Sequence, residues 1–241
     1  MSHRTHISTM ALIVTLTLGA SACQPGESDA PAEPPASSPD GHETVEHAVE
    51  GVRTAHFTVV STSPTQSFTI TGEIDRTQDE QAVASALVSS DDSTNVDRVI
   101  SVDGHLWREA DEYGDDLWYL LPNHPPLWDP LRDLPGLLGA ASEVDRVGVT
   151  VIDGATVDHF SMVVDSELLP AELLATGPIP ADGAKYELYI DEGLLVGYDN
   201  DMDGSTIKSR LTDINEPVVI ESPPPERQLS PELTRLLLGS E

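Results

Sequence analysis

Three aspartates at alternate positions, Asp199, Asp201 and Asp203, form the sharpest chemical pattern in this 241-residue sequence. Gly204 follows them at a bend, so the segment resembles the first half of a calcium loop, in which alternating carboxylates surround a hard cation. The twelfth position of such a loop requires a bidentate acid, and here it is Arg210. The pattern therefore predicts a solvated turn, with these three aspartates as the only metal candidates.

A second group of possible ligands, His42, Glu43, Glu46 and His47, falls on a predicted helix. A zinc-protease helix needs its two histidines four residues apart, which places both on one face. Here they are five apart, so the spacing predicts solvated side chains. The sequence also lacks a Gly-x-Ser-x-Gly motif, and its one cysteine lies near the N-terminus. We therefore expect no enzymatic activity and no cofactor.

Cys23, the single cysteine, ends an export signal. Arg4 precedes an apolar run at residues 10–18, and small residues lead from there to the cysteine. Ala20-Ser21-Ala22-Cys23 resembles a bacterial lipobox, which predicts removal of residues 1–22 and acylation of the Cys23 sulfur. Ordinary signal peptidase could cut the same bond and leave Cys23 without lipid. The first reading places the protein at the extracytoplasmic face of the cell membrane, held by acyl chains such as palmitate.

The net charge excludes some partners. Twelve Lys and Arg against 42 Asp and Glu give a formal charge of −30. Such a surface repels nucleic acid and anionic lipid headgroups. Because the acids are spread along the chain, they indicate a solvated acidic surface and no single acidic binding site.

The chain divides into three parts. Residues 1–22 are the signal peptide, and residues 23–41 are a lipidated cysteine with a Pro-, Ala-, Ser- and acid-rich tether. Residues 42–241 are expected to fold as a single monomeric domain.

The domain opens with an amphipathic helix of about 13 residues and continues with alternating strands. Apolar residues alternate with polar ones in six short segments from residue 57 to residue 121 and again from residue 147 to residue 215. We therefore predict an α+β fold whose strongly curved antiparallel sheet forms an unclosed half-barrel with helices on its concave face. A last helix is expected after Ser230-Pro231.

The segment from Leu127 to Leu138 breaks this alternation. It is rich in leucine and tryptophan and is interrupted by Pro130 and Pro135. Asp129 and Pro130 predict the start of a short helix, and Pro135 prevents a continuous one. The segment carries more apolar surface than an exposed connection should, so it is expected to cover the sheet as a movable lid.

These features together resemble the actinobacterial lipoprotein family of LppX, LprA, LprF and LprG. The resemblance rests on Leu117-Trp118-Tyr119, on Asp129-Pro130 with the leucines that follow, and on residues 149–165 and 189–194. It covers roughly residues 42–220 and implies a fold related to the LolA-like periplasmic lipoprotein carriers. It also implies a hydrophobic cavity between sheet and helices that holds acyl chains of lipids or glycolipids.

A carrier or retainer of lipid is therefore the leading functional hypothesis, with a lipid or glycolipid as the ligand. The alternatives are a surface adaptor or sensor of the same fold with a filled core and a protein partner, or a cation-binding surface protein. The side chains expected to face the cavity are the apolar members of the alternating segments and of the lid: Phe57, Val59, Phe68, Ile70, Trp118, Leu120, Leu134, Leu137, Leu138, Val149, Val151, Phe160, Met162, Leu188, Ile190 and Val196.

Overall fold

The computed structural model of this protein describes residues 41–77, 82–89, 96–110, 116–122, 129–170, 173, 183–202 and 204–238. All of them belong to one compact unit, Ser37–Glu241. The predicted signal peptide, Cys23 and nearly all of the tether, as well as Leu127 and Trp128, lie outside the described residues. No helix in the described ranges is long and apolar enough to span a membrane.

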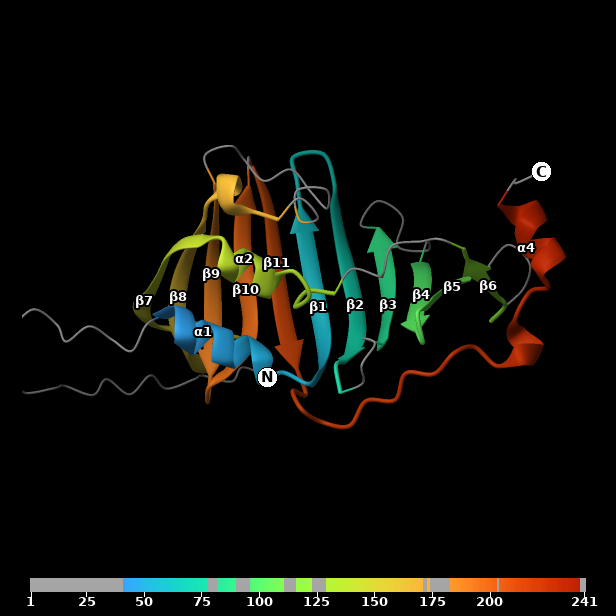
Figure 1. The fold of residues 1–241 in the computed structure, drawn as a ribbon, viewed down its shortest axis with the longest axis horizontal. Coiled ribbons are helices and arrows are strands. Elements are labelled where there is room, and N and C mark those ends of the chain that lie inside the picture. The colour runs from blue at the N-terminus through green and yellow to red at the C-terminus, as the bar shows by residue number, and fades with distance from the viewer. Residues whose placement is uncertain are drawn as a thin grey trace, which may run out of the picture. The chain divides into compact units, whose positions relative to one another are not determined.

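Eleven strands form one antiparallel sheet in the order β6-β5-β4-β3-β2-β1-β11-β10-β9-β8-β7 (Figure 1). The first block comprises β1 (Thr54–Thr62), β2 (Ser67–Asp75), β3 (Ala82–Ser89), β4 (Val96–Val102), β5 (His105–Glu109) and β6 (Trp118–Leu121). The second block comprises β7 (Ala141–Ile152), β8 (Ala155–Val164), β9 (Ala184–Asp191), β10 (Leu194–Met202) and β11 (Ser205–Thr212). β6 and β7 are the two edges of the sheet, so the curved sheet is not closed, and the predicted fold class is confirmed.

The two blocks meet where β1 pairs with β11 along most of its length. Within each block, consecutive strands pair through short connections, as alternating segments separated by turn residues predict. Asp103 and Asp153 adopt a positive φ and each is followed by a glycine that does the same, which is the backbone that tight hairpin turns need.

Two helices cover one face of the sheet, which we call the inner face (Figure 1). They are α1 (Gly41–Glu50) and α2 (Leu134–Gly139). α1 packs on β7, β9 and β10, and α2 packs on β8 and on α1. Helices this short are marginal alone, so burial of Val45, Ala48 and Val49 against the sheet stabilises α1. α1 ends at Glu50, about three residues earlier than predicted, because Gly51 and the turn into β1 follow it.

The predicted start of the second helix is wrong. Residues 129–133 form turns, and the Asp129 carboxylate accepts a hydrogen bond from the backbone N–H of Leu131 at 2.8 Å. The helix begins at Leu134, with Pro135 in its first turn. Proline is tolerated there because an N–H in the first turn has no intrahelical acceptor.

The other helical segments are short. η2 (Ser166–Leu168) and η3 (Pro225–Arg227) are single 3₁₀ turns, and α4 (Pro231–Leu237) is capped by Ser230 as predicted. The C-terminal segment reaches the far edge of the sheet, where Leu229 donates its N–H to the Trp118 carbonyl at 2.7 Å. α4 therefore belongs to the β5–β6 end of the sheet.

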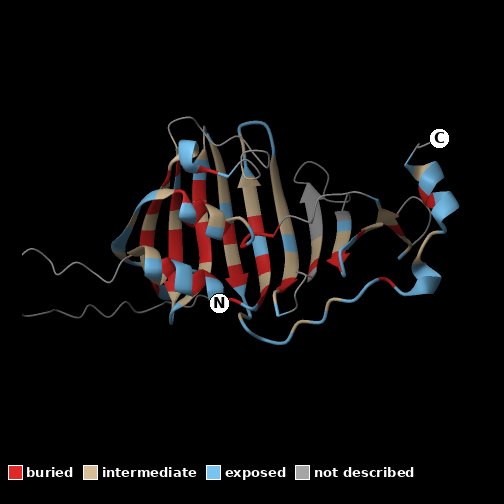
Figure 2. Cartoon of the chain, in the orientation of Figure 1, coloured by how far each residue is buried: buried red, intermediate tan, exposed pale blue. Residues whose placement is uncertain are grey.

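Burial follows the layers (Figure 2). The main core joins α1 and α2 to the inner face of β1 and β8–β11, with Met162, Leu188 and Leu195 fully buried. The opposite face, which we call the outer face, carries mostly polar side chains over β8–β11, such as Glu187, Asp199 and Lys208.

Candidate ligand-binding face

Most of the predicted cavity residues do lie on the inner face. Nine are buried members of the main core: Phe57, Val59, Leu134, Leu137, Leu138, Phe160, Met162, Leu188 and Ile190. Ile70 packs against that core and Phe68 is half-buried on the same face. The fold therefore brings this set together, and its role as a cavity lining stays a prediction.

The remaining predicted residues lie outside the buried core. Val149 and Val151 are 65% and 63% exposed on the edge strand β7, beyond the part that α1 covers, so they are not core residues. A bulge between Arg146 and Gly148 shifts their register relative to the first half of the strand. The prediction that they face a buried interior is wrong.

Trp118 and Leu120 face outward. β5 pairs Trp107 with Leu120 and β4 pairs Ile100 with Trp107, a row that continues through the outer-face residues Ala84 and Glu73. Inward positions on β6 are instead Tyr119 and Leu121. Val196, the last of the predicted set, lies half-buried in a bulge of β10 between Leu195 and Gly197.

The inner face over β2–β6 has little helical cover. α1 and α2 pack on strands of the other block, and the described residues provide no further helix on this face. One row of this face is nevertheless largely apolar, with Ile74, Val83, Leu106 and Leu121 on β2, β3, β5 and β6 and Ser101 between them on β4. Ile74, Val83 and Leu106 are nevertheless 5% exposed or less, so their cover comes from parts of the chain other than α1 and α2.

A group of polar side chains interrupts the apolar inner face near its centre. We call it the inner polar cluster, and its members are Asp129, Tyr186, Tyr198, Asn200 and Ser209. Strand register brings the last four together, because Tyr186 lies opposite Asn200 and Tyr198 lies opposite Ser209. The centroids of the Tyr186 and Tyr198 rings are 6.2 Å apart. Asp129, in the connection that precedes α2, lies close enough to Tyr198 for its charge to act on that residue.

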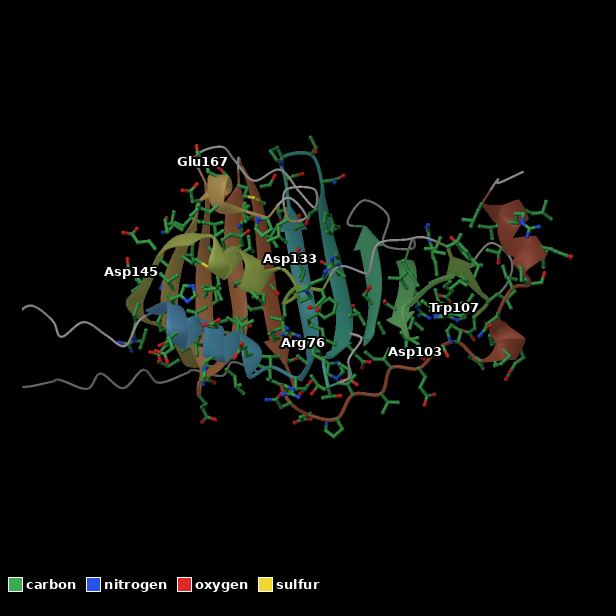
Figure 3. The ribbon with its side chains drawn as sticks, viewed as in Figure 1. Arg76, Asp103, Trp107, Asp133, Asp145 and Glu167 are labelled. Carbon is green, nitrogen blue, oxygen red and sulfur yellow. The ribbon has the colours of Figure 1, made fainter. Side chains whose placement is uncertain are left out.

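Burial disfavours the charged forms of the ionisable side chains in this cluster. It raises the pKa of Tyr186 to about 12 and raises the pKa of Tyr198 further still. Burial likewise raises the pKa of Asp129, although the hydrogen bond from Leu131 and the nearby Arg76 charge oppose that shift. The half-buried Asp133 beside it also has a pKa raised by burial. Figure 3 labels Arg76 and Asp133 on the helix-covered side of the sheet.

The aspartates of the calcium-like pattern belong to a different structure. Asp199 and Asp201 lie within the strand β10, on the outer face. The prediction of a solvated turn had placed them in a loop. Asp203 lies outside the described residues. Sequence reasoning ended the strand early because an Asp- and Asn-rich run is unfavourable in strands, yet pairing with β11 extends β10 to Met202.

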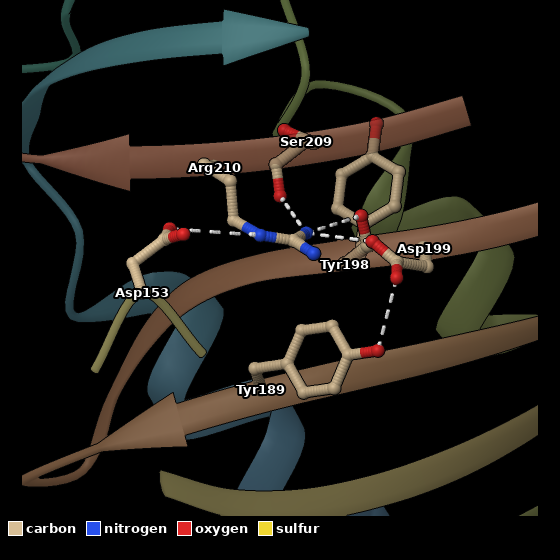
Figure 4. A network of polar contacts seen from close by, with 6 residues as sticks. All are labelled: Asp153, Tyr189, Tyr198, Asp199, Ser209 and Arg210. Carbon is tan, nitrogen blue, oxygen red and sulfur yellow. Dashed lines mark hydrogen bonds and ion pairs between the residues drawn. The ribbon is translucent and has the colours of Figure 1, made fainter. Parts of the chain in front are cut away.

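Arg210, which takes the place of the twelfth calcium ligand, instead binds Asp199 directly (Figure 4). Its Nη1 donates to the Asp199 carboxylate at 2.6 Å, and its guanidinium lies 5.1 Å from the centre of the Tyr189 ring. The Tyr189 hydroxyl donates to the other Asp199 oxygen at 3.1 Å. The carboxylate is thus satisfied by protein partners. The described residues contain no group of three His, Cys, Asp or Glu side chains placed to hold a metal.

The outer face carries two pockets that the sequence did not predict. One of about 610 Å³ lies between α4 and the β5–β6 end, lined by Trp107, Leu120, Pro122, Leu229 and Leu238 among others. A shallower one of about 460 Å³ lies over β1–β4, with Trp118 at its side. The only sequence signal for the larger pocket is that Trp107 and Leu120 occupy outward positions in their alternating strands. The other wall of that pocket comes from residues more than 100 positions away.

Comparisons with known proteins agree with this geometry. No protein-family model matches the sequence. No curated protein matches it either. Among solved structures, LprF from Mycobacterium bovis superposes with a TM-score of 0.54 at 16% identity, over 77% of this chain and 98% of LprF. The lipoprotein LppX from Mycobacterium tuberculosis gives 0.53 at 13% identity, over 75% and 98%.

This chain has the fold of LprF and LppX. The resemblance predicted from the sequence is thereby confirmed at the level of the fold. Both matched structures are covered almost completely, so the shared part is the whole sheet-and-helix architecture and not a single motif. At identities of 13% and 16%, function has to be argued from this chain's own residues.

Proposed function

We propose that this protein binds the acyl chains of a lipid or glycolipid on the inner face of its sheet, and that it carries or retains that lipid at the cell envelope. It does so as an extracytoplasmic protein held to the membrane through Cys23. Its role is binding and not catalysis. The fold shared with the lipoprotein LppX supports this proposal without deciding it.

The observation that carries the proposal is the mismatch between the apolar inner face and its helical cover. α1 and α2 have 10 and 6 residues, and both pack on the β7–β10 side of an eleven-stranded sheet. On the inner row over β2–β6, Val83 and Leu106 are buried and Leu121 is half-buried, although neither α1 nor α2 packs on these strands. Hydrocarbon chains suit such a surface because each buried CH₂ contributes about 0.8 kcal/mol, so a chain of about 16 carbons can bind tightly without directional contacts.

The test is lipid extraction from the purified protein. The chain with Cys23→Ser, expressed with its own signal in an actinobacterial host, should leave the membrane and carry lipid in about stoichiometric amount. Organic extraction followed by mass spectrometry measures that lipid. Recovery of this protein free of lipid, and without uptake of added lipid, would contradict the proposal.

A matched pair of variants locates the binding face. Leu121→Arg places a charge on the inner face of the edge strand β6, where Leu121 is half-buried, and should strongly reduce the lipid recovered. Val151→Arg places the same charge on the opposite edge strand, at a position 63% exposed, and should leave the lipid unchanged. Equal loss in both variants would show that the effect is not specific to the β6 end of the inner face.

An adaptor that binds a protein partner is the second candidate. The observation that favours it is the pocket of about 610 Å³ on the outer face, together with the dense packing of the inner face under α1 and α2. The same extraction separates the two, because an adaptor with a filled core should carry no lipid.

A further inference from the structure

Among the described residues, most of the buried side-chain polar atoms that have no hydrogen-bond partner belong to the inner polar cluster. Asn200 is 3% exposed, and neither its amide nitrogen nor its amide oxygen has a hydrogen-bond partner among those residues. The Ser209 hydroxyl is fully buried and equally unpartnered. Asn200 lies beside the Tyr186 hydroxyl and Ser209 beside that of Tyr198, but neither reaches bonding geometry.

Two more unpartnered atoms face this group from outside the four strand positions. Asp129 uses one carboxylate oxygen to accept from Leu131, and its other oxygen has no partner although the residue is only 1% exposed. Arg76, whose charge acts on Asp129, has a buried Nη1 that is also without one in the described chain.

Leaving such atoms unpaired costs about 1–3 kcal/mol each, whereas apolar side chains of the same size at these strand positions would cost nothing of the kind. A strand interior has no local need for them, since the neighbouring inner positions are filled by Leu188, Met162 and Val59. The cluster therefore has the features of a site that meets polar atoms of another molecule.

The chemistry of the cluster restricts that molecule. Tyrosine, serine and asparagine offer neutral donors and acceptors, which pair with hydroxyl and carbonyl groups. A phosphate or carboxylate would be placed against Asp129 and Asp133, and a cation would meet Arg76. Neither charge sign is favoured. The half-buried Asp133, whose side chain is 24% exposed, marks the side on which the cluster approaches the surface.

We propose that the inner polar cluster binds an uncharged oxygen function of the lipid, a hydroxyl group, and so selects lipids that carry one within or next to their hydrocarbon part. This inference rests on the proposed lipid binding and adds to it a specificity that a purely apolar face would lack. The oxygen function can belong to a neutral headgroup or to a substituted chain, and the experiment separates the two.

Three C18 probes of equal chain length make the test: methyl stearate, methyl 12-hydroxystearate and monostearin. Each is used to displace a fluorescent fatty-acid ester from the Cys23→Ser chain. One added hydrogen bond contributes up to about tenfold in affinity, so at least one hydroxylated probe should bind about tenfold more tightly than methyl stearate. Preference for methyl 12-hydroxystearate assigns the cluster to the chain, and preference for monostearin assigns it to the headgroup.

The variant that tests the site is Asn200→Leu, with Ser209→Ala as a second, smaller change. Asn200→Leu removes two unpartnered buried atoms, so the folded protein should keep or increase its melting temperature, while the hydroxyl preference should be lost. Methyl stearate should bind this variant as well as it binds the parent. Thr58→Val, an exposed outer-face change of similar chemistry on β1, is the control and should retain the preference.

Each result decides the inference. Binding of all three probes with equal affinity overturns it while leaving the proposed lipid binding intact. A preference that survives in both Asn200→Leu and Ser209→Ala also overturns it, because another part of the chain then reads the hydroxyl. A strong loss of stability in Asn200→Leu with unchanged preference overturns it as well, since ordered water alone then satisfies the cluster. Failure of every probe to bind contradicts the proposed function itself.

Discussion

At the scale of single residues, Asp129 combines a structural and an electrostatic role. Its carboxylate closes the turn before α2 through Leu131, yet burial raises its pKa against the opposing effect of Arg76. A group whose pKa is higher in the folded state binds its proton more tightly there than in the unfolded chain. Its contribution to stability is therefore fully present below the ordinary value of 3.8 and is lost as the pH rises through the raised value.

Asp129→Asn should remove that pH dependence. The amide keeps an oxygen for the Leu131 N–H but cannot ionise, so the variant should be more stable than the parent at neutral pH, with an advantage that shrinks as the pH falls toward 3.8. Urea denaturation at a series of pH values measures the difference.

Asp145→Asn is the control for this pH series, because Asp145 is exposed on β7. It should change the free energy of unfolding by less than about 0.5 kcal/mol at every pH. A pH-independent effect of Asp129→Asn would show that Asp129 acts only through its turn.

At the scale of elements, the packing of β2 between its neighbours β1 and β3 depends on Gly72. A Cβ at this position would collide with the Ala84 carbonyl oxygen and with the Phe57 ring. Phe57 is a core residue that lies opposite Gly72, so its ring occupies the space that a side chain would need. Glycine usually weakens a strand, but here its lack of a side chain allows the Phe57 ring and the Ala84 carbonyl to approach the backbone closely.

Gly72→Ala should therefore cost about 1–3 kcal/mol, or more, in the free energy of unfolding, as overpacking does. Gly139→Ala at the end of α2 is the matched change, since a Cβ there would meet nothing within 4 Å. It should be neutral or slightly stabilising. Chemical denaturation of both variants checks the contrast, and equal midpoints would argue against the packing of the Phe57 ring over Gly72.

At the scale of the whole molecule, the charge of −30 opposes compaction. Salt screens this repulsion, with a Debye length that falls from about 10 Å at 0.1 M to about 3 Å at 1 M. The melting temperature should rise with NaCl, by about 2–4 °C for each kcal/mol of repulsion removed.

CaCl₂ at the same ionic strength should give the same rise, because Asp199 is already bound by Arg210 and Tyr189. An additional stabilisation specific to calcium would restore the metal hypothesis for Asp199, Asp201 and Asp203. Thermal unfolding in the two salts, with MgCl₂ as a third, measures this.

The anchor is a separate prediction at this scale. Cys23→Ser should abolish labelling by a radioactive or clickable fatty acid and release the protein from the membrane fraction. Because the acidic surface is repelled by anionic lipid, nothing else should hold it there. Retention of the unlabelled variant in the membrane fraction would contradict the lipid anchor.

The sequence alone determined the features that depend on neighbouring residues. Alternation of apolar and polar side chains predicted the strands, and Ser230-Pro231 predicted the start of α4. These signals are local, because side-chain period, backbone conformation and helix capping act within a few residues. The antiparallel α+β fold follows from them, since the strands are too closely spaced for parallel crossovers.

The tertiary structure decided which apolar and polar residues meet. Val149 on β7 and Val157 on β8 lie on opposite faces of the sheet, and the inner-face Val149 is 65% exposed whereas the outer-face Val157 is 3% exposed. Periodicity states which side of a strand a residue occupies but not whether anything covers that side. The inner polar cluster depends in the same way on the register of β9, β10 and β11, and the large outer pocket on the return of α4 to β5 and β6. Contacts between such distant segments are set by packing of the whole chain, which no local pattern encodes.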